Sequence, residues 1–245
     1  MTFCLGMRVR EGLVGLADTR IISGNECLTA RKIATYRGEG YSLFVMTSGL
    51  RSVRDKTLTY FAELMEDRPE PFARTFKAVN AFAEQLRRVA AEDKHALEES
   101  GLSFSISALI GGQFPQDKEP KLYLVYPQGN WVEIGPGTPY AIIGATGYGK
   151  PVLDRTLRFE DSLRLALKVG CLAFDSTRIS ASDVDFPLDV ILYANGVLHE
   201  HRYERHDLRD VNTWWQDRLR ELVQKLPSDW MDTALRGLAE GKPDS

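Results

Sequence analysis

The hydrophobic and polar positions along the chain change period several times, and each change marks a predicted element. Alternation with a period of two predicts two hairpins in the first fifty residues, with glycine at each turn. Their four strands are expected at residues 3–9, 13–17, 31–37 and 41–47. The last of these is mostly apolar, which predicts burial on both faces. The segment 19–30 between the hairpins is polar and is expected to be a loop.

A helical period begins at Leu50, and Pro69 with Pro71 divides the helical region into two helices. The second helix has a clear apolar stripe and is expected to end near Ser100-Gly101. The stripe consists of Phe72, Phe76, Val79, Phe82, Leu86 and Val89. One face of this helix is therefore expected to cover a sheet.

Strand patterns return in the second half of the chain and alternate with further helices. Strands are expected at residues 102–111, 121–126, 131–134, 140–144 and 189–194. Helices are expected from Pro151 and over residues 161–174, and a loop is expected over residues 175–187. The last helix is strongly amphipathic, and its apolar stripe consists of Leu208, Val211, Trp215, Leu219, Leu222 and Leu226.

The order of these elements indicates the fold class. Hairpins dominate, so the sheets are expected to be mainly antiparallel. Because the helices come in separate pairs, the pattern predicts an α+β fold with two layers of helix over two layers of sheet. No linker or repeat is visible, so residues 1–245 are expected to form one domain, with an amphipathic helical extension at about residues 203–240.

Composition narrows the class of protein only in part. The 245 residues are 43% hydrophobic, and the net charge of −3 gives no indication of a nucleic-acid or membrane partner. No run of eighteen apolar residues exists, and the N-terminus lacks the apolar core of a secretory signal. Cys4, Cys27 and Cys171 have no metal-ligand spacing and suit a reducing, cytoplasmic setting.

Thr2, Asp18 and Lys32 have the chemistry of a catalytic constellation. A Thr hydroxyl is a weak nucleophile and needs a base. If Met1 is removed, the α-amine of Thr2, with an ordinary pKa of about 7.7–8.0, can accept that proton near neutral pH. Lys32 would keep the amine unprotonated, and Asp18 would hold Lys32 in place. The backbone N–H of Gly49, at the end of the following strand, would stabilise an oxyanion. Taken singly, each residue is more often structural, so the spacing alone is weak evidence.

Several short segments share a wider pattern with these residues. They are Met1-Thr2-Phe3-Cys4, Leu16-Ala17-Asp18, Ser48-Gly49, Tyr148-Gly149-Lys150-Pro151, Leu153-Asp154-Arg155, Phe174-Asp175-Ser176-Thr177 and Pro187-Leu188-Asp189. Together they resemble the β-subunits of proteasome-type N-terminal threonine hydrolases, and among these the bacterial branch called Anbu, the ancestral β-subunit. The resemblance covers most of residues 2–200.

The resemblance implies a fold, an activity and an assembly. The fold is the αββα sandwich of N-terminal nucleophile hydrolases, and the activity is that of a threonine peptidase acting on a peptide or amide substrate without a metal or cofactor. By position, Thr2 matches the nucleophile, Asp18 its acidic partner, Lys32 the catalytic lysine and Gly49 the oxyanion donor. Asp175 matches the accessory acid that helps to orient the amine. The family forms homo-oligomers, as rings or open helical stacks. Whether this chain also works with an unfoldase partner is left open by the sequence.

The sequence also departs from the proteasomal pattern. Where proteasomal subunits carry Gly-Ser-Gly, this chain has Gly144-Ala145-Thr146-Gly147, so Thr146 stands in for the supporting serine. The Ser-Gly-Gly that follows the accessory acid is absent, and Ser180 is its substitute. These departures favour one alternative from another functional class: a catalytically silent scaffold that assembles with the same fold.

Two other motifs compete with this interpretation. Residues 144–150 match G-x-x-x-x-G-K of a phosphate-binding loop, but Pro151 follows in place of the Ser or Thr that binds Mg²⁺. A tight turn from strand to helix is therefore preferred. His199 and His201 would share one face of a strand and could bind a metal. Their surroundings are heavily charged and offer no further ligand, so a solvated or subunit-facing segment is preferred.

Overall fold

The computed structural model describes residues 2–23, 26–67 and 72–239. The chain divides into two compact units, Met1–Arg205 and His206–Ser245. The first unit holds two five-stranded sheets in which every neighbouring pair of strands is antiparallel. The first sheet consists, in spatial order, of β10 (Tyr140–Gly144), β1 (Phe3–Val9), β2 (Gly12–Asp18), β11 (Leu188–Ala194) and β12 (Val197–Tyr203). The second sheet consists of β5 (Ile33–Gly38), β6 (Tyr41–Gly49), β7 (Ile106–Gln113), β8 (Lys121–Val125) and β9 (Trp131–Glu133).

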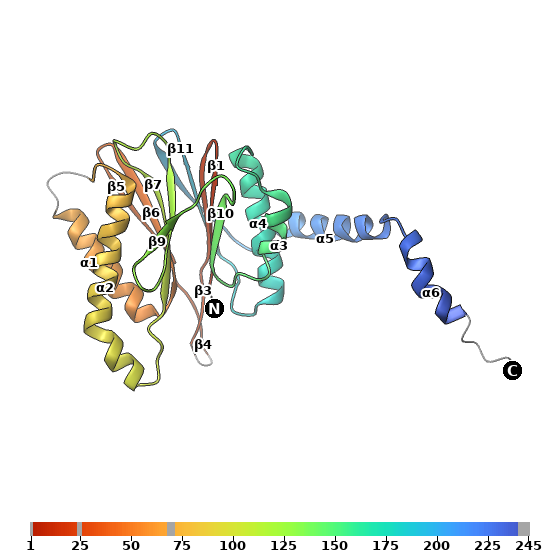
Figure 1. Cartoon of the computed structure of the whole chain (residues 1–245), viewed down its shortest axis with the longest axis horizontal. Helices are drawn as coiled ribbons and strands as arrows, with labels where there is room; N and C mark the ends of the chain where they lie inside the picture. The colour runs from red at the N-terminus through yellow and green to blue at the C-terminus, as the bar shows by residue number, and fades with distance from the viewer. Residues whose placement is uncertain (1, 24–25, 68–71, 240–245) are drawn as a thin grey trace. The chain divides into compact units, whose positions relative to one another are not determined.

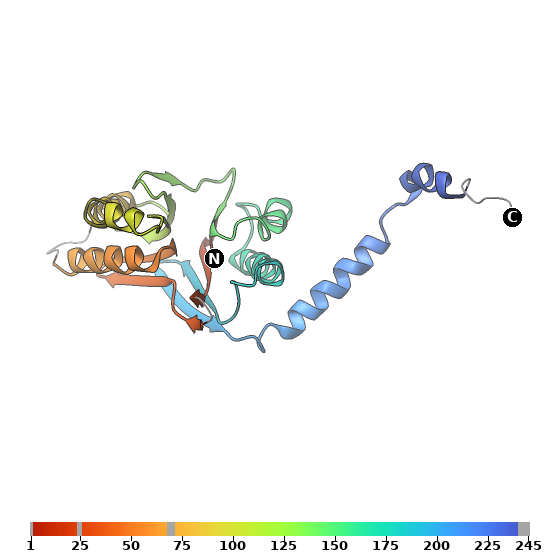
Figure 2. The same cartoon turned by 90° about the horizontal axis from the view of Figure 1, so that it is seen from below.

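Two pairs of helices cover the outer faces of the sheets. Helices α1 (Arg51–Glu66) and α2 (Thr75–Glu99) pack on the second sheet, and α4 (Leu163–Ser180), which contacts α3 (Lys150–Thr156), packs on the first. Figure 1 and Figure 2 show the two sheets between these helical layers. The predicted four-layer αββα sandwich of antiparallel sheets is therefore confirmed.

The apolar pattern of the strands explains why the sheets stack. All seven residues of β1 and of β2 are buried, because one face of each strand contacts the second sheet and the other contacts α4. On the helix side, Phe3 packs against Phe174 with ring centroids 5.9 Å apart. Between the sheets, Phe44 and Met46 belong to one buried apolar cluster with residues of β1 and β2. The beginning of β1 is thus held from both sides.

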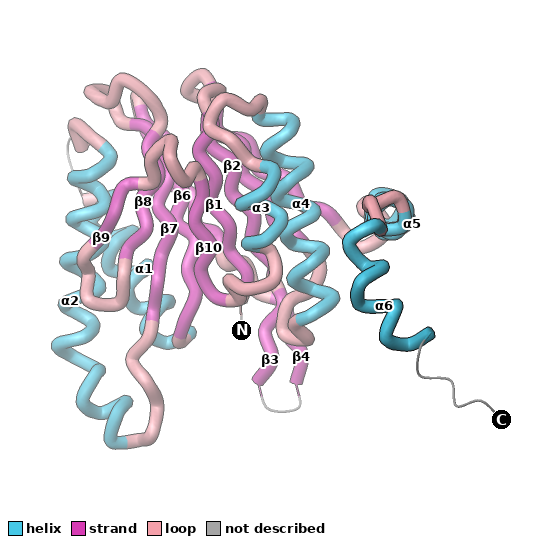
Figure 3. The backbone as a smooth tube through the Cα atoms, turned by 45° about the vertical axis from the view of Figure 1, so that its right-hand side comes forward, coloured by secondary structure: helices cyan, strands magenta, loops and turns pink. Residues whose placement is uncertain are grey.

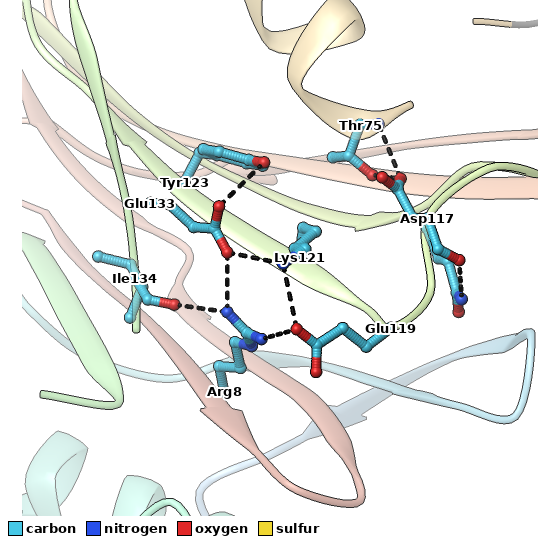
Figure 4. A network of polar contacts seen from close by, with 9 residues as sticks. Arg8, Thr75, Asp117, Glu119, Lys121, Tyr123, Glu133 and Ile134 are labelled. Atoms are coloured by element: carbon cyan, nitrogen blue, oxygen red, sulfur yellow. Dashed lines mark hydrogen bonds and ion pairs between the residues drawn. The ribbon is translucent and has the colours of Figure 1, made fainter. Parts of the chain in front are cut away.

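The predicted apolar stripe of α2 faces the second sheet. Val79, Phe82, Leu86 and Val89 are buried in the cluster that α1 and α2 form with this sheet. Asp117 stabilises the beginning of α2, because its carboxylate accepts from the backbone N–H of Thr75 at 2.8 Å and from the hydroxyl at 2.6 Å (Figure 4). Pro69 and Pro71, which were expected to separate the helices, lie outside the described residues.

The expected loop over residues 19–30 is wrong. The structure has a two-stranded hairpin there, β3 (Arg20–Ser23) and β4 (Glu26–Thr29), which pair only with one another. Figure 3 shows this hairpin at the end of the sheets where the N-terminus lies. Ile22 and Leu28 are 43% exposed, so the hairpin lacks the buried apolar face that makes strands recognisable in a sequence.

Two further boundaries differ from the prediction. Helix α4 continues to Ser180, so the expected loop over residues 175–187 begins too early. Polar residues at this end suggested a loop, but Asp175 and Thr177 are buried residues of the helix. Strand β12 was not among the expected strands, and it pairs with β11 as the outer strand of the first sheet.

The second unit consists of helical segments alone within the described residues. These are α5 (Arg209–Gln224), a 3-10 helix (Asp229–Met231) and α6 (Asp232–Ala239). The predicted apolar stripe is largely exposed along α5 and just after it, with Leu219 46%, Leu222 59% and Leu226 61% accessible. The single-domain assignment stays a prediction. None of the described helices combines the length and the apolar character that crossing a membrane requires.

Arg8 of β1 ties the two sheets together through a polar network. Its side chain is 6% exposed and contacts Glu119 at 2.6 Å and Glu133 at 3.0 Å, both from the second sheet or its loops. Arg8 Nη1 also donates to the carbonyl of Ile134 at 3.0 Å. Lys121 bridges the same two carboxylates (Figure 4). The buried guanidinium thus binds two carboxylates and one backbone carbonyl.

We expect Arg8→Met to lower the free energy of unfolding by about 1–3 kcal/mol, because it removes charge-assisted hydrogen bonds between the sheets. The carboxylates of Glu119 and Glu133 are 50% and 38% exposed and can regain water, which limits the loss. Arg10→Met is the matched control: its side chain is 68% exposed and 4.0 Å from Glu160, so an effect below about 0.5 kcal/mol is expected. Urea denaturation of both variants measures the difference, and equal effects would contradict the prediction.

Candidate active site

Asp18 lies at the centre of a buried polar cluster built from two strand ends. It is the last residue of β2, and its side chain is fully buried. Its Oδ1 accepts from Lys32 Nζ at 2.7 Å and from the backbone N–H of Phe3 at 2.8 Å. Its Oδ2 accepts from the backbone N–H of Arg20 at 3.1 Å. The carboxylate is therefore held by three donors and orients the start of β1 as well as Lys32.

Lys32 stands directly before β5 and points into the same cluster. The residue is 4% exposed, and its ammonium also donates to the carbonyl of Arg20 at 2.7 Å. Its backbone carbonyl accepts from the N–H of Thr47 on β6 at 3.2 Å. Because both the side chain and the backbone are bound, the ammonium has little conformational freedom to lose when it acts on a neighbouring group.

The electrostatics of this pair combine two opposing influences. Burial raises the pKa of the Asp18 carboxyl above its ordinary value, since the charged form loses water. The positive charge of Lys32 and the N–H groups of Phe3 and Arg20 lower that pKa and oppose the effect of burial. Lys32 is therefore the main charge that favours the carboxylate form of Asp18.

Thr2 is held by its backbone rather than by its side chain. Its carbonyl accepts from the N–H of Ala145 at 2.6 Å, and Phe3 pairs with Gly144 at the edge of the sheet. Gly144 has a φ of +89°, and a Cβ built on it would stand 1.8 Å from the carbonyl oxygen of Thr2. Only glycine allows this close approach, so the turn after β10 determines where Thr2 lies.

A cleft of about 310 Å³ brings three of the predicted residues together. Thr2, Lys32 and Gly49 all line it, as do Gly144 and Ser48. Gly49, at the end of β6, has a φ of +138°, and a Cβ there would stand 2.1 Å from the carbonyl oxygen of Ser105. The tight approach to the neighbouring strand explains the glycine at this strand end.

The remaining predicted residues do not line this cleft. Asp175 is 2% exposed on α4, and its carboxylate binds Arg178 at 2.6 Å. Thr146 is exposed in the turn that follows β10, one residue after the Ala145 N–H that contacts Thr2. Ser180 is exposed at the last position of α4. Met1, whose removal the prediction requires, lies outside the described residues.

Sequence reasoning missed the arginines of the cleft. Arg20, Arg51 and Arg54 line it together with Thr47. Arg51 and Arg54 are three residues apart in the first turn of α1, and this spacing in the helix that follows a Ser-Gly strand end is a signal that the sequence contains. Arg20 had no such signal, because the hairpin to which it belongs was not recognised.

The competing motifs have structural explanations. The turn 144–150 leads into α3, and the ammonium of Lys150 is held by Asp154 at 2.8 Å and by the hydroxyl of Tyr140 at 3.0 Å. Lys150 is therefore engaged within the turn. His199 and His201 are exposed on β12, and the described residues contain no cluster of three or more metal-ligating side chains.

The sequence and the structure were compared with known proteins, and similar proteins were found among the solved structures. No protein-family model matches the sequence, and no curated protein matches it. Among solved structures, an Anbu (Gly-1) mutant from Hyphomicrobium sp. strain MC1 matches with a TM-score of 0.85 and 26% identity, covering 93% of this chain and 98% of that one. A helical assembly of the Anbu complex from Pseudomonas aeruginosa matches with a TM-score of 0.85 and 29% identity, covering 92% and 97%.

A third solved structure gives the same result. Anbu (ancestral beta-subunit) from Yersinia bercovieri matches with a TM-score of 0.83 and 27% identity, covering 92% of this chain and 97% of that one. The likeness thus extends over more than nine-tenths of the chain and includes the sandwich that carries Thr2, Asp18 and Lys32. The resemblance that the sequence indicated is confirmed: this chain is similar to the Anbu (ancestral beta-subunit) proteins and has their proteasome-like fold.

Proposed function

We propose that the chain is a proteasome-type threonine peptidase or amidohydrolase that uses Thr2 as its N-terminal nucleophile after removal of Met1. The observation that carries this proposal is the buried ion pair of Lys32 and Asp18, 2.7 Å apart, whose carboxylate also binds the backbone N–H of the residue after Thr2. A desolvated ammonium that lines the same cleft as Thr2 disfavours protonation of the Thr2 amine. The amine can then serve as the base.

The proposed reaction has two chemical steps. The Oγ of Thr2 attacks the carbonyl carbon of a peptide or amide bond while its proton passes to the Thr2 amine, directly or through water. The N–H of Gly49 donates to the resulting oxyanion, and the proton then moves to the leaving amine as the C–N bond breaks. Water hydrolyses the ester and regenerates the hydroxyl. Asp18 orients Lys32, whereas Asp175, Thr146 and Ser180 keep proposed accessory roles.

A scaffold without activity is the second candidate, and one observation favours it. The carboxylate of Asp175 is bound to Arg178 at 2.6 Å, and Thr146 and Ser180 are exposed. The groups that would assist the Thr2 amine are thus engaged elsewhere or face solvent. In this alternative the same residues hold the start of β1 in place for assembly and carry out no reaction.

The first prediction for function concerns Thr2 itself. The purified full chain is first weighed by intact-mass spectrometry to establish that Thr2 is the first residue. A peptide electrophile that forms an adduct with N-terminal threonine is then expected to add one label per chain, because the cleft places Lys32 beside Thr2. Thr2→Ala is expected to remove the label without changing thermal stability, and Thr156→Ala, an exposed threonine, serves as the matched control.

Each result separates the two candidate functions. One label per chain, lost in Thr2→Ala and kept in Thr156→Ala, excludes the inactive scaffold. An unlabelled protein whose first residue is Thr2 contradicts the peptidase proposal. A protein that keeps Met1 throughout lacks an N-terminal threonine nucleophile, and this result also favours the scaffold.

We also propose that the protein acts in the cytoplasm as a homo-oligomer, in a ring or an open helical stack. The three cysteines carry no disulfide, which suits a reducing compartment. The exposed apolar stripe of α5 offers a surface for a second copy of the chain, since apolar patches of this kind mark interfaces. The similar Anbu complex from Pseudomonas aeruginosa forms a helical assembly, which supports the proposal.

Assembly is expected to fail when charged residues replace leucines of this apolar stripe. The double variant Leu222→Glu with Leu226→Glu replaces side chains that are 59% and 61% exposed, so folding of each chain should survive. Light scattering is expected to show multi-subunit particles for the unchanged protein and mainly 27.6 kDa monomers for the variant. Gln216→Glu adds one negative charge at an exposed position of α5 outside the stripe and should leave the particle mass unchanged. A monomeric unchanged protein would contradict the proposal.

A further inference from the structure

The cleft beside Thr2 has a strongly one-sided charge. Four cationic side chains line it, namely those of Arg20, Lys32, Arg51 and Arg54. No carboxylate appears among the described residues that line it. A cleft with one sign of charge concentrates ligands of the opposite sign. How strongly this cleft does so depends on whether nearby acids neutralise the four cations.

Neighbouring acids neutralise only part of this charge. Lys32 has Asp18 as its own partner, but Arg51 and Arg54 share Asp55, at 3.3 Å and 2.6 Å. Because Asp55 carries one negative charge, one positive charge of Arg51 and Arg54 remains uncompensated. Arg20 shares Asp185 with Arg205, and Asp183 is a second acid close enough to interact with Arg20. The rim of the cleft thus keeps uncompensated positive charge at Arg51 and Arg54.

The beginning of α1 reinforces this charge. Positive residues are unfavourable in the first turn of a helix, because the backbone N–H groups there already carry partial positive charge. Helix α1 nevertheless has Arg51 and Arg54 at this end, no acidic residue in its first turn and no side-chain cap on Leu50. A bound anion would offset this arrangement, since its charge complements both the helix end and the guanidinium groups.

Two donors of the cleft also lack a partner in the protein. The Nε of Arg20 and the hydroxyl of Thr47 are buried, and neither has a hydrogen-bond partner among the described residues. Thr47 is 2% exposed and stands next to Lys32 through a backbone hydrogen bond. Buried donors without acceptors are rare in folded proteins, and a ligand oxygen in the cleft would supply the missing acceptor.

We propose that the cleft binds the carboxylate side chain of a glutamate or aspartate on the acyl side of the bond that Thr2 attacks. Arg51 and Arg54 provide the opposite charge, and Arg20 with Thr47 provides hydrogen bonds. The acyl side is assigned because Thr2 and Gly49, the proposed nucleophile and oxyanion donor, line the same cleft as Arg51 and Arg54, and the attacked carbonyl belongs to the acyl-side residue. Its volume of about 310 Å³ is at the lower end of ligand sites and suits one side chain. The position of the carboxylate relative to the cleaved bond rests on the proposed function. The binding of a carboxylate in the cleft does not.

Binding is tested without reaction on the full-length Thr2→Ala protein. Three blocked tetrapeptides that differ only in their last residue, Glu, Gln or Lys, are titrated by calorimetry at low and high salt. We expect the Glu peptide to bind about tenfold more tightly than the Gln peptide at low salt, with a smaller ratio at high salt. Equal affinity of the Glu and Gln peptides would overturn the proposal.

The variants assign the effect to the cleft. Arg51→Gln is expected to lower the preference for Glu several-fold, since the Arg51 side chain lines the cleft and is 60% exposed. Arg88→Gln is the matched control, because Arg88 also forms an i,i+4 pair and is 55% exposed, but lies on α2 outside the cleft. Thr47→Val removes the unpaired hydroxyl with little change of shape and should weaken binding of the Glu peptide. An equal loss in Arg51→Gln and Arg88→Gln would contradict the assignment.

A parallel experiment keeps this proposal separate from the proposed function. The unchanged protein is treated with electrophilic tetrapeptides that carry the same last residues, and labelling of Thr2 is followed by mass. Labelling that favours Glu supports both proposals, and labelling without preference overturns the carboxylate site alone. If no label forms but the Thr2→Ala protein prefers the Glu peptide, the peptidase proposal fails and the binding site stands. If no label forms and the Thr2→Ala protein shows no preference for the Glu peptide, both proposals are contradicted.

Discussion

Lys32→Met is expected to lower the free energy of unfolding by about 3–5 kcal/mol, because it leaves the fully buried carboxylate of Asp18 without its cation. The carbonyl of Arg20 loses the Lys32 donor at the same time. The N–H groups of Phe3 and Arg20 still donate to Asp18, but they carry no net charge. Urea denaturation of the variant measures this loss, and the labelling of Thr2 should disappear with it.

A surface lysine provides the control for this prediction. Lys150 pairs with Asp154 at 2.8 Å, but the two side chains are 55% and 45% exposed, so Lys150→Met should cost less than about 1 kcal/mol. The double variant Lys32→Met with Asp18→Asn is expected to be less destabilised than Lys32→Met alone, since no unpaired charge remains. Equal losses in Lys32→Met and Lys150→Met would show that burial of the pair has no energetic consequence.

The pH dependence of Lys32→Met gives an independent check. Lys32 is the main charge that lowers the pKa of Asp18 and so offsets the effect of burial. Without Lys32, the pKa of Asp18 in the folded variant should rise further above its unfolded value. A carboxyl with a raised folded pKa takes up a proton on folding, and stability therefore increases as pH falls through that pKa. We expect the stability deficit of Lys32→Met to shrink on acidification from neutral pH. A deficit that grows on acidification would contradict this explanation.

Gly144→Ala is expected to abolish labelling of Thr2 and to destabilise the fold by about 2–4 kcal/mol. A Cβ at this position would stand 1.8 Å from the carbonyl oxygen and 2.7 Å from the carbonyl carbon of Thr2, and backbone atoms cannot move aside as a side chain does. The φ of +89° is strained for alanine in addition. Thr2 must therefore shift, and a shift of about 1 Å is enough to lower a reaction rate about a hundredfold.

Gly147→Ala is the matched control in the same turn. A Cβ on Gly147 meets no atom within 4 Å. Its effect on stability should stay within about 0.5 kcal/mol, and labelling of Thr2 should be unchanged. Thermal unfolding and intact-mass labelling compare the two variants. If Gly144→Ala behaves like Gly147→Ala, the turn after β10 does not determine the position of Thr2.

The sequence determined most of the elements, because their patterns are local. The hairpin of residues 3–9 and 13–17 was recognisable from alternating apolar positions and the turn at Gly12, and β1 and β2 match it within one residue. The apolar stripe from Phe72 to Val89 predicted the covering face of α2. The hairpin of β3 and β4 escaped prediction, since its two strands pair only with one another and Ile22 and Leu28 are largely exposed.

The sequence by itself also suggested a candidate catalytic set, namely Thr2, Asp18, Lys32 and Gly49, whose role in a reaction stays a prediction. The pairing of Asp18 with Lys32 was predicted, but only the tertiary structure showed that the two meet at 2.7 Å and are buried, because one precedes a strand of the second sheet and the other ends a strand of the first. It also decided that Arg20 and Arg51 line one cleft with Thr2. Contacts of this kind depend on how two sheets stack and how far they exclude water. A periodic pattern records which face of an element is buried, but not which distant residue is buried against it.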